Sequence, residues 1–182
     1  MTTQKIEARL NFQLREAEDE ADRKLLAKVA KYGWAVMSIS AGESSETEPP
    51  FSFTIGLFFH ALTPEVIIVG MEAGSAVDVL NAIGNYVMSG KSLHENVIYP
   101  ELAPGRSVLF KYVSVKHYQA YLGTALWFYH GLKRKFPVLQ CFYSDEQGRF
   151  PWHKDYIRNK TSALLQLDLS SDTDFRVNVE SA

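Results

Sequence analysis

Residues 51–71 read FSFTIGLFFHALTPEVIIVGM and contain two strand patterns in succession. Over residues 51–57, large and small side chains alternate with the two-residue period of a strand that has one buried face. Residues 63–65 (TPE) predict a turn. Residues 66–71 then form a continuous apolar run rich in β-branched side chains, which is typical of a central strand. Because the connection between the two strands is short, we expect them to be antiparallel.

The rest of the chain predicts an α+β domain. Further strands are expected at residues 34–39, 108–115 and 136–143, and helices at residues 75–90 and 117–129. The first of these helices opens with Ser75 and Asp78 at the spacing of a capping box. Residues 91–106 contain two prolines and a glycine and are expected to be a loop. The order of elements indicates either a curved, mostly antiparallel sheet or a small split-barrel-like core, flanked by helices.

The charge pattern divides the chain into three regions. Residues 1–31 predict an amphipathic helix, because apolar side chains recur every three or four residues from Ile6 to Val29. Gly33 is the expected end of this helix. Residues 32–167 are expected to form the single domain, and residues 168–182 an acidic, mobile tail. The helix either packs on its own domain or binds a partner.

Composition excludes several classes of protein. The 182 residues carry 19 basic and 21 acidic side chains, a net charge of −2, which argues against a nucleic-acid binder. A single cysteine, Cys141, excludes a disulfide scaffold and a multi-cysteine zinc site, and we expect it to be buried and structural. None of the five histidines has the spacing of a metal pair, so no metal site is expected. Neither a membrane span nor a secretion signal is predicted, so a cytoplasmic location is expected.

Six motifs, in order along the chain, resemble the bacterial DUF4262 family, a domain of unknown function. They are Gly33-Trp34, residues 51–57 (FSFTIGL), Pro64-Glu65, residues 125–129 (ALWFY), residues 136–140 (FPVLQ) and residues 148–152 (GRFPW). The resemblance covers about residues 24–157. The family pattern often has histidine where this chain has Tyr32, Ala35 and Thr63, and aspartate in place of His153. If those family residues carried out chemistry, these departures imply a shift from chemistry toward binding.

The order of elements is also similar to that of flavin-binding split barrels, such as pyridoxamine-phosphate oxidase-like proteins. By this analogy an FMN-like flavin would be bound by Ser52 and Thr54 on one strand face and by Ser75 at a helix start, with positive charge added by Lys111 or Arg106. The alternative is that Ser52 and Thr54 are hydrogen-bonded locally or solvated, and that Ser75 only caps its helix.

Residues 127–156 hold nine of the 23 aromatic side chains. Such a concentration predicts either an aromatic pocket or interface, or a core layer between a helix and a strand. The candidate residues for the pocket or interface are Trp127, Tyr129, Gln140, Arg149 and Trp152.

These patterns contain no combination of residues that is typical of a catalytic site, so whether the protein is an enzyme stays open. The sequence favours a binding or interaction module with a protein partner, for example an accessory or toxin-neutralising protein. The alternative is a split-barrel protein that binds a flavin or another planar ligand, for example an oxidoreductase. A third hypothesis is a homodimer formed through the helix of residues 5–31.

Overall fold

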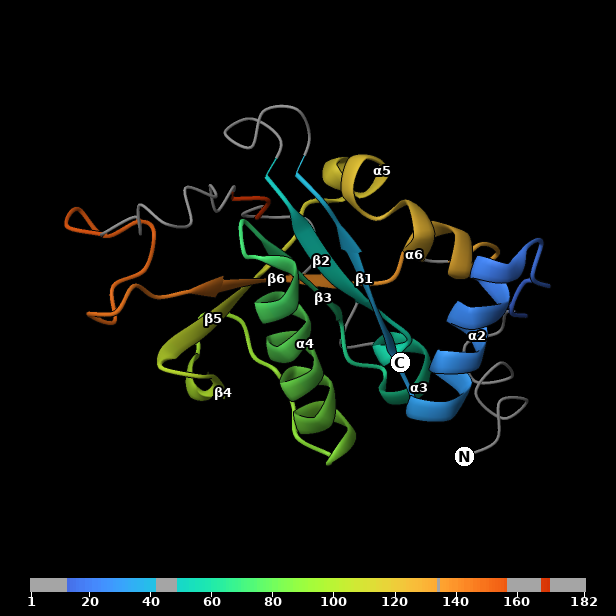
Figure 1. Cartoon of the computed structure of the whole chain (residues 1–182), viewed down its shortest axis with the longest axis horizontal. Coiled ribbons are helices and arrows are strands. Elements are labelled where there is room, and N and C mark those ends of the chain that lie inside the picture. Colours follow the sequence, from blue (N-terminus) through green and yellow to red (C-terminus); the bar gives the residue numbers. More distant parts are fainter. Residues whose placement is uncertain (1–12, 42–48, 134, 157–167, 171–182) are drawn as a thin grey trace.

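A six-stranded mixed sheet forms the centre of the computed structural model, which describes residues 13–41, 49–133, 135–156 and 168–170 (Figure 1). The strands are β1 (Ala35–Ile39), β2 (Phe51–Ile55), β3 (Glu65–Val69), β4 (Ile98–Ala103), β5 (Arg106–Tyr112) and β6 (Val138–Tyr143). Their order is β1-β2-β3-β6-β5-β4, and only the β3–β6 pair is parallel. The α+β class and the mostly antiparallel sheet are confirmed. The sheet keeps two edges, β1 and β4, so the split-barrel alternative is wrong.

Helices cover both faces of the sheet. They are α2 (Glu20–Tyr32), α3 (Leu57–Ala61), α4 (Ala73–Met88), the 3₁₀ turn η1 (Val115–His117), α5 (Tyr118–Tyr121) and α6 (Gly123–Phe128). Along β3, Ile67 packs into the cluster shared with α2, α5 and α6, whereas Val66 and Ile68 pack into the cluster shared with α4. All three side chains are fully buried. The continuous apolar run that predicted a central strand is therefore explained by burial on both faces.

The connection between β2 and β3 differs from its prediction. The alternating pattern predicted a strand through Leu57, but β2 ends at Ile55 and a short helix, α3, follows. The chain turns at Gly56, whose φ of 113° is open to glycine and costly for other residues. The pairing of Phe51 with Val69 confirms the antiparallel hairpin.

Two further segments correct the sequence predictions. Residues 91–106 were expected to be a loop, but they contain β4, where Pro100 is tolerated because an edge strand leaves some N–H groups unpaired. In place of the single helix expected at residues 117–129 the chain forms η1, α5 and α6, and the non-helical backbone of Leu122, with φ of −125°, separates α5 from α6.

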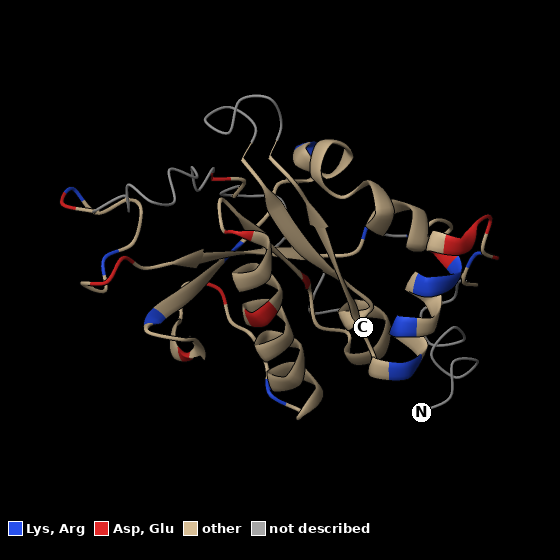
Figure 2. Cartoon of the chain, viewed as in Figure 1, with Lys and Arg blue, Asp and Glu red and all other residues tan. Residues whose placement is uncertain are grey.

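The N-terminal helix begins later than the charge pattern suggested. Asp19 caps α2 by accepting a hydrogen bond from the backbone N–H of Asp22 at 2.9 Å, and Gly33 ends the helix as predicted. The expected helix of residues 1–31 falls partly outside the described residues, since residues 1–12 are not among them. Leu25 and Val29 of the apolar stripe are buried in the protein's own core, while lysines and arginines lie along the outer face (Figure 2). In the part of the chain that the structure describes, no helix has the length and apolarity that a membrane crossing requires.

Trp34 provides a test of how α4 packs against β1. A Cβ atom added at Gly84 would lie 2.6 Å from Cζ2 and 2.7 Å from Nε1 of the Trp34 indole. Alanine normally stabilises a helix interior by about 1 kcal/mol relative to glycine. Here we expect Gly84→Ala to lower the free energy of unfolding by about 2 kcal/mol, because the indole must move.

Urea denaturation of a double-mutant cycle checks this prediction. In a Trp34→Ala background, the same Gly84→Ala substitution is expected to raise the free energy of unfolding, because the obstructing ring is gone. An equal effect in both backgrounds would contradict the packing described.

Candidate functional site

Glu65, the first residue of β3, is a completely buried carboxylate. Its Oε1 accepts hydrogen bonds from the backbone N–H groups of Gly56 (2.8 Å) and Phe58 (3.0 Å) and from the hydroxyl of Tyr129. Its Oε2 accepts from Oγ1 of Thr54 at 2.6 Å. Four donors from four positions thus meet on one side chain, and we call this set the Glu65 network.

The Glu65 network is closed. Oγ1 of Thr54 also accepts from the backbone N–H of Val66 at 2.8 Å, and the Tyr129 hydroxyl accepts from the N–H of Phe59 at 3.2 Å. Among the described residues, no buried side-chain nitrogen or oxygen lacks a hydrogen-bond partner. The network therefore fixes α3 against β2, β3 and α6, and a fully satisfied buried network of this kind is rigid.

Burial raises the pKa of Glu65, because the carboxylate loses its water; the hydrogen bonds from Thr54 and Tyr129 act in the opposite direction. Burial and the neighbouring Glu65 also raise the pKa of Tyr129. Tyr129 consequently stays protonated and donates its hydroxyl proton to the carboxylate.

A pH dependence of stability follows from the raised pKa of Glu65. The folded protein binds this proton more tightly than the unfolded chain does, so the contribution of Glu65 is fully present below its ordinary pKa of 4.5. It is lost as the pH rises through the folded-state pKa. We expect the free energy of unfolding of the protein, minus that of Glu65→Gln, to fall in denaturant titrations as the pH rises from 4.5 through the higher folded-state pKa. A difference that stays level or rises over this range would contradict the raised pKa.

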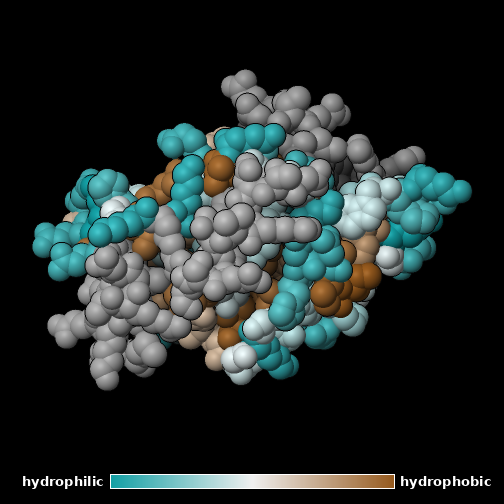
Figure 3. All heavy atoms as spheres, turned by 180° about the vertical axis from the view of Figure 1, so that it is seen from behind, coloured by the Kyte–Doolittle hydropathy of each residue, from teal (hydrophilic) through white to brown (hydrophobic). Residues whose placement is uncertain are grey.

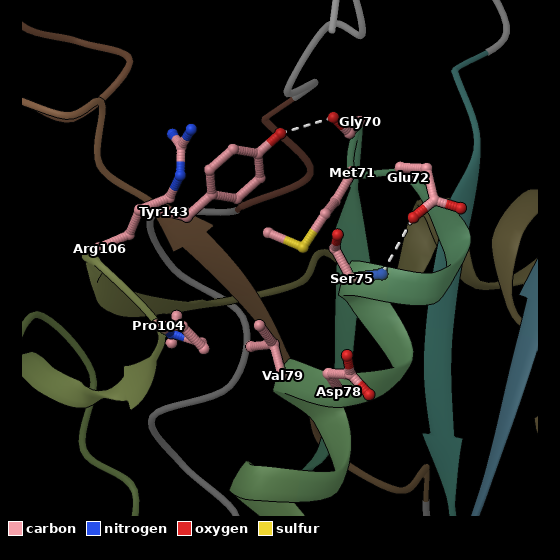
Figure 4. Close-up of a pocket in the computed structure, with 10 residues that line it drawn as sticks. Gly70, Met71, Glu72, Ser75, Asp78, Val79, Pro104, Arg106 and Tyr143 are labelled. Carbon is pink, nitrogen blue, oxygen red and sulfur yellow. Dashed lines mark hydrogen bonds between the residues drawn. The ribbon is translucent and has the colours of Figure 1, made fainter.

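A cavity of about 250 Å³ opens at the carboxyl ends of β3 and β6, where the two parallel strands lie side by side (Figure 4). It is lined by Gly70, Met71, Glu72, Ser75, Asp78, Val79, Ala103, Pro104, Arg106 and Tyr143. In Figure 4, Arg106 and Tyr143 lie on one side, Ser75, Asp78 and Val79 of α4 lie on the other, and Met71 extends between them. Carboxyl ends of parallel strands are the usual place for ligands in open α/β sheets.

Hydrogen bonds hold both sides of this cavity in place. On the sheet side, the Tyr143 hydroxyl donates to the carbonyl of Gly70 at 2.5 Å, which joins β6 to the end of β3. A guanidinium N–H of Arg106 donates to the carbonyl of Ser144 at 2.9 Å, and the guanidinium carbon lies 5.8 Å from the centre of the Tyr143 ring. The position of Arg106 is thus fixed by β6.

The start of α4 corrects one sequence prediction. The N-cap is Glu72 and not Ser75, so the Ser75–Asp78 capping box is wrong. The Glu72 carboxylate accepts from the N–H groups of Gly74 (2.9 Å) and Ser75 (3.0 Å), which also lowers its pKa. Because these N–H groups are occupied by the helix's own cap, they are not available to hold an anion.

A third feature is an aromatic shelf formed by Phe142, Phe150 and Trp152, with Lys111 over it. Trp152 is 51% exposed and stacks on Phe150 with ring centres 5.2 Å apart. Nζ of Lys111 lies 4.3 Å from the centre of a Trp152 ring, a cation–π contact, and 3.5 Å from a carboxylate oxygen of Asp168.

The five residues considered for a flavin do not all line one cavity. Ser52 is buried and shares a 2.8 Å hydrogen bond with the hydroxyl of Ser38, and Thr54 belongs to the Glu65 network. Lys111 lies at the aromatic shelf. Of the candidates, Ser75 and Arg106 line the cavity.

The candidate aromatic residues are also separated. Tyr129 is a core residue, whereas Trp127 packs at the edge of that core with the Arg15 guanidinium 5.7 Å from its ring. Oε1 of Gln140, a buried residue, accepts from the N–H of Leu169 at 2.7 Å. Arg149 pairs with the carboxylate of Asp145 at 2.8 Å, and Trp152 forms the shelf.

Two further predictions concerned the reactivity of Cys141 and metal binding. Cys141 is buried as predicted, and burial raises the pKa of its thiol, which makes it a poor nucleophile. Within the described ranges, no group of three or more metal-binding side chains comes together.

The sequence patterns missed Glu65, Asp78 and Tyr143 as site residues. A signal for Glu65 was present, since an acidic residue opened an otherwise apolar, buried strand. No pattern of neighbouring residues indicated the cavity. Tyr143 of β6 comes close to α4 only because β6 pairs with β3, and Arg106 only because β5 pairs with β6.

Fold and site together define a class: an α+β domain with a closed, buried carboxylate network and a separate open cavity. The chain belongs to the DUF4262 family, a domain of unknown function, whose family model matches residues 28–157. No curated protein and no solved structure matches it. Four of the motifs that carry the resemblance lie together at the Glu65 network: Gly56, Glu65 and Tyr129 belong to it, and the carbonyl of Gly33 bonds to Nδ1 of His60 in α3 at 2.9 Å. These motif residues hold the fold.

Proposed function

We propose that this protein is a binding module that holds a small polar molecule in the cavity between α4, β5 and β6. The observation that supports it is the position and lining of the cavity: it lies at the carboxyl ends of two parallel strands and combines charged with apolar residues. Concave sites with a mostly apolar wall and a few convergent polar groups are the usual form of a small-molecule site.

The geometry favours a small ligand over a flavin. A volume of about 250 Å³ lies below the usual range of about 300–1,000 Å³ for drug-sized ligands. The hydroxyl of Thr54, which the flavin hypothesis required, is bonded to Glu65, and the sheet is open. An FMN-like flavin would therefore need a different place in the structure.

A matched pair of variants tests the proposal. Ser75 is exposed at the rim of the cavity, so Ser75→Phe is expected to fill it without disturbing the core. Ala27→Phe, on the exposed face of α2, adds the same side chain elsewhere.

Isothermal titration calorimetry would measure binding of glucose, ethanolamine, L-leucine, L-leucinamide and 4-methylpentanoate. We expect at least one to bind, with affinity reduced about tenfold or more by Ser75→Phe and kept by Ala27→Phe. If none binds, or if Ser75→Phe leaves the affinity unchanged, the proposal fails.

Protein binding is a second candidate, favoured by the exposure of Trp152. Tryptophan is common among the residues that dominate protein interfaces, and as an accessory or toxin-neutralising protein this chain would bind its protein partner at the aromatic shelf. A homodimer through α2 has less support, because Leu25 and Val29 are used inside the chain. On the face that Figure 3 shows, the described hydrophobic residues lie in several separate areas between hydrophilic ones. A cytoplasmic location remains part of this proposal.

A further inference from the structure

Two opposite charges line the cavity without pairing to each other. Arg106 begins β5 on one side, and Asp78 lies on α4 on the other (Figure 4). Asp78 has no hydrogen bond or ion pair with any described residue, and Arg106 has no ion pair within the described part of the chain. Both residues line the same cavity and neither is ion-paired with a described residue, so each charge is available to a ligand there.

Two other polar side chains of the cavity already form hydrogen bonds within the protein. The Glu72 carboxylate is bound to the start of α4, and the Tyr143 hydroxyl is bound to Gly70. The rest of the wall is apolar and consists of Met71, Val79, Ala103 and Pro104. The cavity therefore offers a ligand one cationic group, the carboxylate of Asp78 and an apolar surface, beside the Ser75 hydroxyl and the carboxylate of Glu72 that caps α4.

We infer that the ligand is a small zwitterion with an apolar body, of the amino-acid type; this inference rests on the proposed function. Its carboxylate would accept from the N–H groups of Arg106 that do not bond to Ser144, since a guanidinium fork matches a carboxylate. Its ammonium group would donate to Asp78. Its body would lie against Met71 and Val79.

Charge complementarity excludes the two simpler alternatives. An anion alone would leave Asp78 facing like charge, and a cation alone would place like charge beside Arg106. Such juxtapositions are the repulsive elements by which a site rejects wrong ligands.

Three probes with the same branched body separate these cases by calorimetry. L-leucine carries both charges, L-leucinamide keeps only the ammonium group, and 4-methylpentanoate keeps only the carboxylate. We expect L-leucine to bind about tenfold or more tightly than either of the others.

Two variants assign the charges to residues. Arg106→Gln is expected to abolish the preference for L-leucine over L-leucinamide. Asp78→Asn is expected to abolish the preference for L-leucine over 4-methylpentanoate. Lys28→Gln and Asp155→Asn, which change exposed charges outside the cavity, are expected to change neither ratio.

The outcomes separate this inference from the proposed function. If L-leucinamide or 4-methylpentanoate binds as tightly as L-leucine, or if another of the five compounds binds and L-leucine does not, the zwitterion is wrong and the cavity remains a binding site. If no compound binds, both are wrong. Thermal unfolding of each variant confirms that a lost affinity is not a lost fold.

Discussion

Replacing Glu65 with alanine is expected to lower the free energy of unfolding by about 4 kcal/mol or more. The substitution leaves the N–H groups of Gly56 and Phe58 and the hydroxyls of Thr54 and Tyr129 without their acceptor. Each buried polar group left unpaired costs about 1–3 kcal/mol, and the space left by the side chain adds to this. Denaturant unfolding followed by circular dichroism measures the loss, and a chain without a cooperative transition would be its extreme form.

Two controls separate the carboxylate from the general effect of a substitution. Glu65→Gln keeps the shape and one acceptor oxygen, so we expect an intermediate loss of about 1–2 kcal/mol. Glu146→Ala removes an exposed carboxylate and is expected to change stability by less than about 0.5 kcal/mol. A Glu65→Ala protein as stable as Glu146→Ala would contradict the role given to the Glu65 network.

The second large effect is expected at Gly56, where Gly56→Ala should lower the free energy of unfolding by about 3 kcal/mol. Its φ of 113° is costly for any residue with a Cβ atom. That atom would also lie 2.8 Å from the carbonyl oxygen of Gly33 and 2.9 Å from Cγ1 of Val29. Because one obstacle is backbone, a side-chain rotation cannot relieve it.

Gly90→Ala is the matched control, because Gly90 has a φ of 89° and nothing within 4 Å of an added Cβ atom. Gly90→Ala should lower the free energy of unfolding only by the cost of placing a residue with a Cβ atom at a positive φ, about 1 kcal/mol. If the two alanine variants lose the same stability, the close approach of Gly56 to Gly33 does not contribute.

The sequence predicted elements well where the pattern was local. The strand of residues 51–55, the apolar run of residues 66–69 and the helix end at Gly33 all depend on neighbouring residues, and all are confirmed. The single buried face expected of residues 51–55 is wrong, because Ser52 and Thr54 are buried as well as Phe53 and Ile55. The predictions failed where a distant residue decides the structure. The strand expected to reach Leu57 ends early because Glu65 binds the N–H groups of Gly56 and Phe58 and so stabilises α3.

The candidate site was harder to predict than the fold. Ser75 was identified for an anion site, but Glu72 occupies the N–H groups that would bind the anion. Thr54 was identified as a ligand residue, although its hydroxyl completes a buried network. In both cases a polar side chain has an internal partner, and a sequence pattern does not show whether such a partner exists.

The structure also shows where the residues that differ from the family pattern lie. Tyr32 is 55% exposed, and His153 is exposed, with its Nδ1 accepting from the N–H of Asp155 at 3.1 Å. Ala35 is buried at the start of β1. The cavity lining includes none of these residues, nor Thr63, so its chemistry does not depend on them.

The central claim is that the family motifs hold the fold and that the cavity at the ends of β3 and β6 binds the ligand. Amide chemical shifts from ¹⁵N NMR, recorded while L-leucine is added to the full chain, test this claim most directly. The account predicts that the largest shifts fall within residues 70–79 and 103–106 and at Tyr143. Largest shifts at Lys111, Phe142 and residues 149–152, or no shifts at all, would contradict it.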